Sequence, residues 1–280
     1  MGHTGLDFTV HSLGSGSCGN SMLVQAGGTK ILLDAGISAR QLQKRLSKFR
    51  VSLSELDAIF LTHEHGDHTI GAYLLSKRFG VPIIANSATL TALPQESVPP
   101  KCRTMNTGES IALGDLLIES FPISHDAADP VGYNVYHRKC KASFVTDTGV
   151  AGEDILRRIE DADLAVIESN HDADRLMTGP YPWFLKARIM SDTGHLSNEA
   201  AADLVLNHIL RSRRPPCIWL AHLSKTNNSP RIARRYMQQR LSEAGCGSVV
   251  LDVAPRDTAG LTWRPGSRAI QMELFTPSRQ

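Results

Sequence analysis

The chain has 280 residues, of which 41% are hydrophobic and 21% are charged, and its formal net charge is +2. This is the composition of an ordinary globular protein, and the length is sufficient to bury a substantial core. No stretch approaches the roughly 20 apolar residues of a membrane-spanning helix, and residues 1–7 lack a secretory signal. The five cysteines are scattered and odd in number, which argues against a disulfide framework. We therefore expect a cytoplasmic protein that does not associate with membranes.

Short apolar runs and helical patterns alternate in the first third of the chain. The predicted strands are residues 8–13, 21–26, 30–34, 58–62 and 81–85. Apolar residues recur at helical spacing over residues 40–49 and again over residues 69–79.

A second strand-rich block follows, and helices dominate the last third. The predicted strands of this part are residues 110–113, 116–121, 132–136, 142–146, 164–167 and 217–221. Residues 155–159 form a predicted helix, and Ser197 and Ser229 have the character of helix N-caps, the second followed by a proline. Two strand blocks, each followed by helices, predict an α/β protein with two sheets face to face and helices outside. We expect one domain over residues 1–280, with residues 253–280 a tail of uncertain structure.

Residues 63–68, with the sequence HEHGDH, place four metal-binding side chains within six positions. They lie where a predicted strand meets a predicted helix. In an extended segment His63 and His65 point to one side, so both imidazoles can reach a single ion. Asp67 and His68 follow the bend and face a second ion nearby. Such a dense pattern predicts metal ligands rather than a solvated polar loop.

Other strand ends carry further candidate ligands, which two metal sites require. His125, Asp147 and His222 each follow a predicted strand, and Asp34 ends another, from where it could orient a ligand imidazole. Each alone is weak, because a single Asp or His at a strand end is more often a turn former or a surface residue. Together they predict a di-metal hydrolytic site, in which two ions about 3.5–4 Å apart share a hydroxide as nucleophile. Imidazole ligands suit zinc, whereas carboxylates and phosphate substrates also suit manganese, so the choice between these metals stays open.

This arrangement resembles the metallo-β-lactamase superfamily over nearly the whole chain. The resemblance implies a four-layer αββα sandwich. One metal would then be held by His63, His65 and His125. The other would be held by Asp67, His68 and His222, with Asp147 bridging the two.

More closely, the chain resembles the YycJ/WalJ-like branch of cytoplasmic bacterial nucleases. The segments that carry this likeness are residues 12–21, 168–172, 179–182, 194–198 and 222–228. The branch implies 5′-to-3′ exonuclease activity on double-stranded DNA. Asp67 matches the acidic ligand of the dinuclear nuclease and thioesterase branches, and is expected to be catalytic.

His195 is the second residue expected to be catalytic. It precedes a helix N-terminus, where free N–H groups and the helix dipole attract anions. It resembles the histidine of a tRNase Z segment that contacts the scissile phosphate, which implies a general acid or a phosphate clamp. The alternative is an ordinary polar residue before a helix.

The loop that His222 opens and the helix after it supply the expected contacts to nucleic acid. Residues 211–240 contain eight Lys or Arg and no Asp or Glu, which suits a polyphosphate partner or a solvated basic face. Besides His195, the predicted contacts are Ser224, Lys225, Asn227, Asn228, Arg231, Arg234 and Arg235.

The sequence therefore predicts a di-metal phosphodiesterase, most specifically an exonuclease on duplex DNA. Two other functions stay open. A small-molecule hydrolase of a thioester, lactone or cyclic phosphodiester would have a closed pocket, and a non-catalytic regulatory protein would bind metal without turnover. The choices between DNA and RNA, between terminal and internal cleavage, and between oligomeric states are not decided by the sequence.

Overall fold

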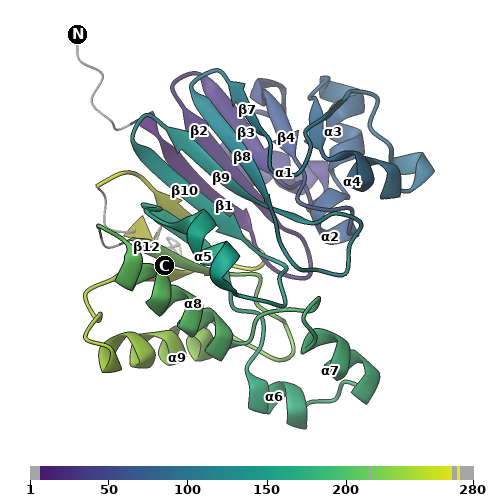
Figure 1. Ribbon diagram of the computed structural model, residues 1–280. Helices are drawn as coiled ribbons and strands as arrows, with labels where there is room; N and C mark the ends of the chain where they lie inside the picture. Colours follow the sequence, from purple (N-terminus) through teal and green to yellow (C-terminus); the bar gives the residue numbers. More distant parts are fainter. Residues whose placement is uncertain (1–6, 215, 267–269, 272–280) are drawn as a thin grey trace, which may run out of the picture.

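Two β-sheets lie face to face in the computed structural model, which describes residues 7–214, 216–266 and 270–271 (Figure 1). Within these residues the first sheet has eight strands in the order β15-β14-β1-β2-β3-β4-β5-β6. They are β1 (Thr9–Gly14), β2 (Ser21–Ala26), β3 (Thr29–Leu33), β4 (Ala58–Phe60), β5 (Ile83–Ala85), β6 (Cys102–Thr104), β14 (Leu261–Trp263) and β15 (Ile270–Gln271). The second sheet has seven strands in the order β13-β12-β11-β10-β9-β8-β7. They are β7 (Ser110–Leu113), β8 (Leu116–Pro122), β9 (Val131–His137), β10 (Cys140–Val145), β11 (Leu164–Glu168), β12 (Cys217–Ala221) and β13 (Val250–Val253).

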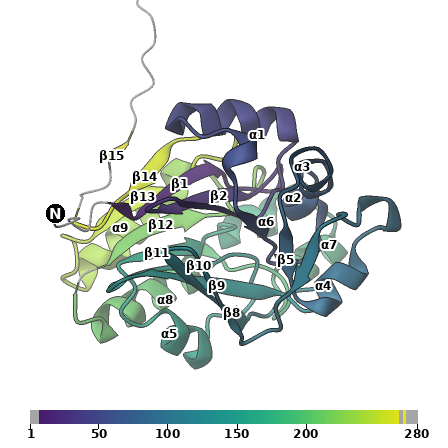
Figure 2. The same ribbon diagram turned by 90° about the horizontal axis from the view of Figure 1, so that it is seen from above.

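Helices cover the outer face of each sheet and give four layers, which Figure 2 shows from above. The first sheet is covered by α1 (Ala39–Leu46), α3 (Ala72–Phe79) and α4 (Ser87–Ala92), and the second by α5 (Glu153–Ile159), α8 (Asn198–Arg211) and α9 (Pro230–Glu243). The short helices α2 (Gly66–Thr69), α6 (Ala173–Thr178) and α7 (Trp183–Ile189) lie at one end of the sandwich, and three 3-10 turns are η2 (Ser47–Phe49), η3 (Leu53–Glu55) and η4 (Gln95–Ser97). The predicted α/β sandwich is confirmed. In the part of the chain that the structure describes, every helix is too short or too polar to cross a membrane.

The core has three apolar layers, one between the sheets and one beneath each set of helices. Phe8, Trp219 and Trp263 are buried between the two sheets. Leu42 and Leu46 pack the apolar face of α1 onto the first sheet, and α8 and α9 pack on the second sheet in the same way. Burial of both sheet faces accounts for the continuous apolar runs of the central strands.

The carboxyl ends of six strands meet at one end of the sandwich. β3 and β4 are parallel, and so are β10, β11 and β12. Because β8 and β10 are both antiparallel to β9, the carboxyl ends of β8 and β10 lie at the same edge of the sheet. The loops after these strands carry the predicted site residues, and such strand ends are where α/β folds place their ligand sites.

The C-terminal segment differs from its prediction as a tail of uncertain structure. β14 pairs antiparallel with β1, with Trp263 opposite Val10, and extends the first sheet. A three-residue strand is too short to show a periodic pattern, so the sequence gives no signal for it. Residues 267–269 and 272–280 of the predicted tail lie outside the described residues.

Two other local predictions also differ from the structure. The helix expected over residues 69–79 is divided into α2 and α3, and α2 begins early enough to include Asp67 and His68. The helices α6 and α7 were not predicted. They flank the Gly179-Pro180-Tyr181-Pro182 segment, and helices of six and seven residues give little periodicity.

Candidate metal centre

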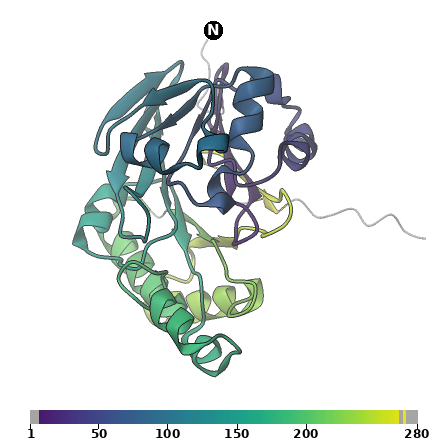
Figure 3. The same cartoon turned by 90° about the vertical axis from the view of Figure 1, so that its right-hand side faces the viewer.

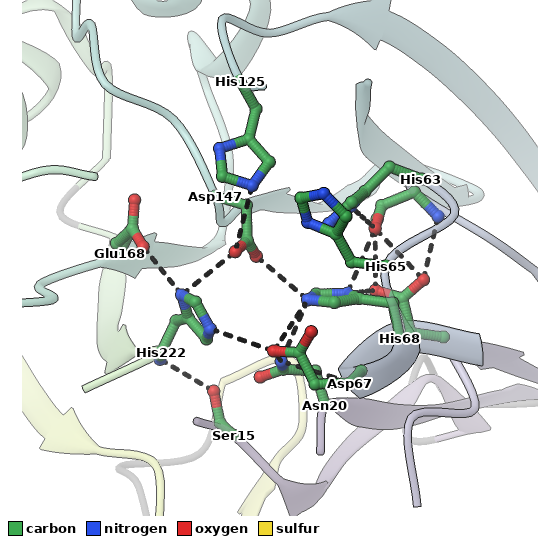
Figure 4. Close-up of polar contacts among 12 residues, drawn as sticks. Ser15, Asn20, His63, His65, Asp67, His68, His125, Asp147, Glu168 and His222 are labelled. Atoms are coloured by element: carbon green, nitrogen blue, oxygen red, sulfur yellow. Dashed lines mark hydrogen bonds and ion pairs between the residues drawn. The ribbon is translucent and has the colours of Figure 1, made fainter. Parts of the chain in front are cut away.

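The histidine-rich segment forms the loop after β4 and the first turn of α2 (Figure 4). Its backbone is fixed by two 2.8 Å hydrogen bonds, from Asn20 N–H to the Asp67 carbonyl and from Ala35 N–H to the His68 carbonyl. A Cβ on Gly36 would lie 1.6 Å from the Asp67 carbonyl oxygen, so this close approach requires glycine. The loop after β3 therefore holds α2 in place and orients its two ligand side chains.

All seven predicted ligand side chains lie in one cluster, with atoms within 4.8 Å of one another in overlapping groups. These groups are His63, His65 and His125; His63, His68 and Asp147; and Asp67, His68 and His222. Asp147 lies centrally, 3.3 Å from His68 Nε2 and 3.2 Å from His222 Nδ1. These groups could hold divalent metal ions, and the division of the ligands between two positions stays a prediction.

Three residues at the strand ends have left-handed backbone conformations. The φ angles of Asp34, Asp147 and His222 are 61°, 60° and 51°. Positive φ is uncommon outside glycine, and such strain persists where the surroundings impose it. In each case the chain turns sharply out of a buried strand and directs the side chain into the cluster.

Asp34 and Thr62 orient the imidazoles of His63 and His68 through hydrogen bonds to their Nδ1 atoms. Asp34 Oδ2 accepts a 2.7 Å hydrogen bond from His68 Nδ1, and Asp34 Oδ1 accepts a 2.8 Å bond from Thr62 N–H. His63 Nδ1 lies 2.9 Å from Thr62 Oγ1, which in turn lies 3.0 Å from Asp34 Oδ2. Both rings thus have Nδ1 engaged, and each directs its Nε2 atom into the cluster.

His125 is oriented by backbone carbonyls instead. Its Nδ1 lies 3.1 Å from the Thr193 oxygen and 3.2 Å from the Gly194 oxygen. Its Nε2 lies 3.9 Å from Asp147. The segment before α8 therefore positions His125, the candidate ligand in the loop after β8.

Buried atoms without partners show that these residues fit divalent cations. Among the residues that the structure describes, His63 Nε2 is buried without a hydrogen-bond partner, and Asp147 Oδ2 and His222 Nε2 are buried with only longer contacts, 3.3 Å to His68 Nε2 and 3.6 Å to Asp67 Oδ2. Burial holds the pKa of His63 well below its ordinary value, so its ring is neutral with a free lone pair. Burial alone would lower the pKa of His222, but Asp147 and its other acidic neighbours raise it to about 10, because the carboxylates favour a positive charge here. A divalent metal satisfies both the lone pairs and the carboxylates.

Glu168, the last residue of β11, is a site residue to which the sequence assigned no role. It is fully buried. Its Oε1 lies 2.7 Å from His222 Nδ1 and 2.9 Å from His195 Nδ1, while Oε2 accepts backbone N–H bonds from Thr148 and Leu196. Burial opposes its ionisation, but His195 and His222 outweigh burial and lower its pKa to about 2. The signal that marked Asp34 and Asp147, an acidic residue ending an apolar strand, also marks Glu168.

His195 lies between the metal cluster and a cavity of about 290 Å³. Its ring centroid is 5.1 Å from that of His125 and 5.2 Å from that of His222. Burial lowers the pKa of His195, but the Glu168 carboxylate outweighs burial and leaves it raised. With Nδ1 bound to Glu168, the ring can present a proton on Nε2.

The predicted nucleic-acid contacts in the loop after His222 differ in their exposure. Ser224 lines the cavity, and Lys225 is exposed beside it. Asn227 is buried, and its side-chain amide has no hydrogen-bond partner in the part of the chain that the structure describes. Asn228 is buried too, and its amide donates 2.8 Å bonds to the Ser169 carbonyl and to Asn198, so it holds the loop together.

Ion pairs neutralise much of the predicted basic run. The pairs are Arg211–Glu153, Arg213–Asp161, Arg214–Asp163, Arg234–Asp252 and Arg240–Asp203. Arg234 therefore does not point freely outward as predicted, because its guanidinium also donates to the Leu251 carbonyl. Lys225, Arg231 and Arg235 are exposed.

Residues 29–211 match the family model described as the beta-lactamase superfamily domain. The chain belongs to this superfamily. It is 37% identical to exodeoxyribonuclease YycJ of Bacillus anthracis over 246 residues, which cover 87% of this chain and 92% of that protein. It is 36% identical to exodeoxyribonuclease WalJ of Streptococcus pneumoniae over 270 residues, which cover 95% of this chain and 98% of that protein. With the ligand cluster, membership of this superfamily makes the protein a metal-dependent hydrolase.

Solved structures share the fold at low sequence identity. The metallo-beta-lactamase fold protein YhfI from Bacillus subtilis is 18% identical and superposes with a TM-score of 0.71, over 92% of this chain and 99% of that one. The short form of human tRNase Z is 19% identical, with a TM-score of 0.59 over 90% and 98% of the two chains. These likenesses confirm the four-layer architecture.

Proposed function

We propose that the protein is an exonuclease that hydrolyses phosphodiester bonds of double-stranded DNA in the 5′-to-3′ direction. The observation that carries this proposal is the Glu168–His195 pair, which lies between the metal cluster and an open cavity lined by hydroxyl groups and by the Arg188–Asp126 ion pair. YycJ and WalJ, named as exodeoxyribonucleases, are similar to this chain over nearly their full lengths, which supports the same substrate class.

Two divalent ions, zinc or manganese, would be held by this cluster. His63, His65 and His125 would hold one ion, Asp67, His68 and His222 the other, and Asp147 both. Bound there, the ions would lower the pKa of water and polarise phosphate oxygens.

The chain's own residues orient the substrate and supply a proton. Glu168 holds His195 Nδ1 and favours its imidazolium form, so Nε2 carries a proton toward the cavity. From there His195 can protonate the leaving oxygen or bind a phosphate oxygen. Asp34 keeps His68 in one tautomer and orientation while this occurs.

Purified protein incubated with end-labelled linear duplexes, with Zn²⁺ and Mn²⁺ in separate reactions, tests this proposal. We expect mononucleotides to be released progressively from the 5′ end, and a closed circular duplex to stay intact. His195→Ala should reduce kcat by about 10²–10⁴-fold, the usual contribution of a positioned acid. Degradation of the closed circle would contradict the exonuclease assignment, and failure to hydrolyse any nucleic acid with either metal would contradict the function.

A further inference from the structure

Helix α7 exposes two adjacent aromatic side chains to solvent. Trp183 is 65% exposed and Phe184 is 74% exposed, whereas Trp219 and Trp263, the other tryptophans of the chain, are buried. α6 and α7 project at the lower end of the molecule in Figures 1 and 3. Adjacent large aromatics in such a position are a mark of a binding surface.

The same helix forms one wall of the cavity beside His195. Tyr181, Leu185, Arg188 and Ile189 line this cavity. Phe184 lies one helical turn before Arg188 and therefore on the same side of the helix. The exposed aromatic pair thus belongs to the helix that lines the cavity.

Several bonds fix the helix relative to the catalytic residues. Arg188 pairs with Asp126, the residue after His125. His195 N–H donates a 2.9 Å bond to the Ile189 carbonyl. The buried Lys186 donates a 2.7 Å bond to the Met177 carbonyl and joins α7 to α6. The aromatic pair therefore lies at a fixed position from His195.

The positive charge beside this surface comes from α6 and the loop after His222. The two basic residues of α7 are themselves engaged, because Lys186 is buried and bonded to the Met177 carbonyl and Arg188 is paired with Asp126. Arg175 of α6 donates to the Thr226 carbonyl, which brings this projection beside the exposed Lys225. An aromatic surface bordered by cations matches single-stranded nucleic acid, whose bases stack while its phosphates meet positive charge.

We propose that Trp183 and Phe184 form a stacking platform for unpaired bases of the strand that enters the cavity. This inference rests on the proposed nuclease function. A cavity of about 290 Å³ is at the lower limit of small-molecule pockets, roughly 300–1,000 Å³, and its size matches a terminal nucleotide better than a base pair. A nucleotide that enters it leaves the complementary strand, and aromatic faces would replace the stacking that the unpaired bases lose.

The Trp183→Ala/Phe184→Ala double variant tests the platform. We expect its KM for linear duplex DNA to rise at least fivefold, while hydrolysis of bis(p-nitrophenyl) phosphate, which carries no base, changes less than twofold. Trp183→Phe should retain the wild-type KM, because a phenyl ring still stacks. Leu210→Ala is the matched control, since Leu210 is 76% exposed and lies near the far end of α8 from His195.

Fluorescence gives an independent measurement, because Trp183 is the tryptophan that a solvent quencher can reach. A phosphorothioate oligothymidylate, which resists hydrolysis, should protect wild-type protein from acrylamide quenching. Equal KM values for the double variant and the wild type would overturn the platform, as would quenching that the oligonucleotide leaves unchanged. A change from dimer to monomer without a change in KM would instead assign this face to a second copy of the chain. If wild-type protein degrades no DNA at all, it is the proposed function that fails.

Discussion

Glu168 connects residues that approach the site from two loops. One of its oxygens is within hydrogen-bond distance of both His195 and His222, and the other binds two backbone N–H groups. A carboxylate behind a metal-ligating histidine fixes the tautomer and raises the basicity of the ligand. Glu168 is thus a positioning residue that acts on both the second metal position and the proposed acid.

We expect Glu168→Gln to lower kcat and metal affinity together, each by roughly 10–100-fold. Glutamine keeps the size of the side chain, but it carries no charge, and its NH2 group cannot accept the backbone N–H bonds of Thr148 and Leu196 while its oxygen serves the two imidazoles. Steady-state kinetics and titration of the metal-free protein with Zn²⁺ measure the two effects. Glu153→Gln, which alters an exposed partner of Arg211, serves as the control and should leave both values unchanged. Loss of activity at unchanged metal affinity would restrict Glu168 to orienting His195.

The clustering of the seven candidate ligands was predictable because each follows an apolar run or belongs to the dense 63–68 motif. A single Asp or His at a strand end is weak evidence for a metal site, whereas their combination with the 63–68 motif is strong evidence. Asp147 and His222 are close only because their strands are parallel neighbours of β11. The roles of Asn228 and Arg234 were not predictable, because their partners Ser169 and Asp252 are distant in sequence.

At the scale of elements, α9 and the loop before it carry two kinds of basic residue. Some are exposed and can contact a phosphate, and others are already ion-paired with carboxylates. Changing Lys225, Arg231 and Arg235 to Ala should weaken DNA binding. It should also reduce the slope of log K against log salt by about 0.9 for each DNA phosphate that the variant no longer neutralises. Fluorescence anisotropy of a labelled duplex across salt concentrations measures this slope.

The matched control removes the same number of charges from paired arginines. Arg211, Arg214 and Arg240 each form an ion pair with a carboxylate. Their simultaneous change to Ala should leave the salt slope near the wild-type value. If both triple variants reduce the slope equally, net charge rather than a defined surface binds the DNA.

Helix α8 contains a second kind of histidine, whose function is structural. His208 is 1% exposed, and burial together with the nearby Lys141 lowers its pKa to about 4, although Asp161 opposes this. Because the folded pKa lies below the unfolded value of 6.5, the stability it contributes is complete above pH 6.5 and is lost as the pH falls toward 4.

When the pH falls from 7 to 5, the free energy of unfolding should decrease by about 2 kcal/mol more in the wild type than in His208→Gln. Urea unfolding at the two pH values measures the difference. Release of metal at low pH affects both proteins alike, so it cancels in the comparison. An identical loss in both proteins would show that His208 is already protonated in the folded state.

Element boundaries were predictable where capping residues mark them. Ser197 and Ser229 accept hydrogen bonds from the backbone of α8 and α9, as their sequence context indicated. Asp172 caps α6 in the same way, but α7 has no side-chain cap, and the positions of both helices depend on contacts with Asp126 and the His222 loop. The proposed stacking platform therefore lies in a part of the chain for which the sequence contains little structural signal.

At the scale of the whole molecule, the sandwich depends on a strand from each end of the chain. β1 pairs with β2 on one side and with β14 on the other. The loop after β1 places Ser15 Oγ 2.9 Å from His222 N–H, so the first sheet supports a ligand that comes from the second. Pairing of β14 with β1 thus supports the strand whose following loop contacts His222.

Trp263→Ala should destabilise the protein by about 3–5 kcal/mol, the usual cost of removing a buried tryptophan side chain. Trp263 is 2% exposed and packs edge-on against Phe8, with ring centroids 5.5 Å apart, so the substitution leaves a cavity between the sheets. Urea unfolding followed by circular dichroism measures the loss, and Trp183→Ala is the control, because an exposed tryptophan should change stability by less than about 0.5 kcal/mol. If the two substitutions cost the same, β14 contributes little to the core. The apolar surface between the sheets would then be sufficiently buried by β1 to β5 and the second sheet alone.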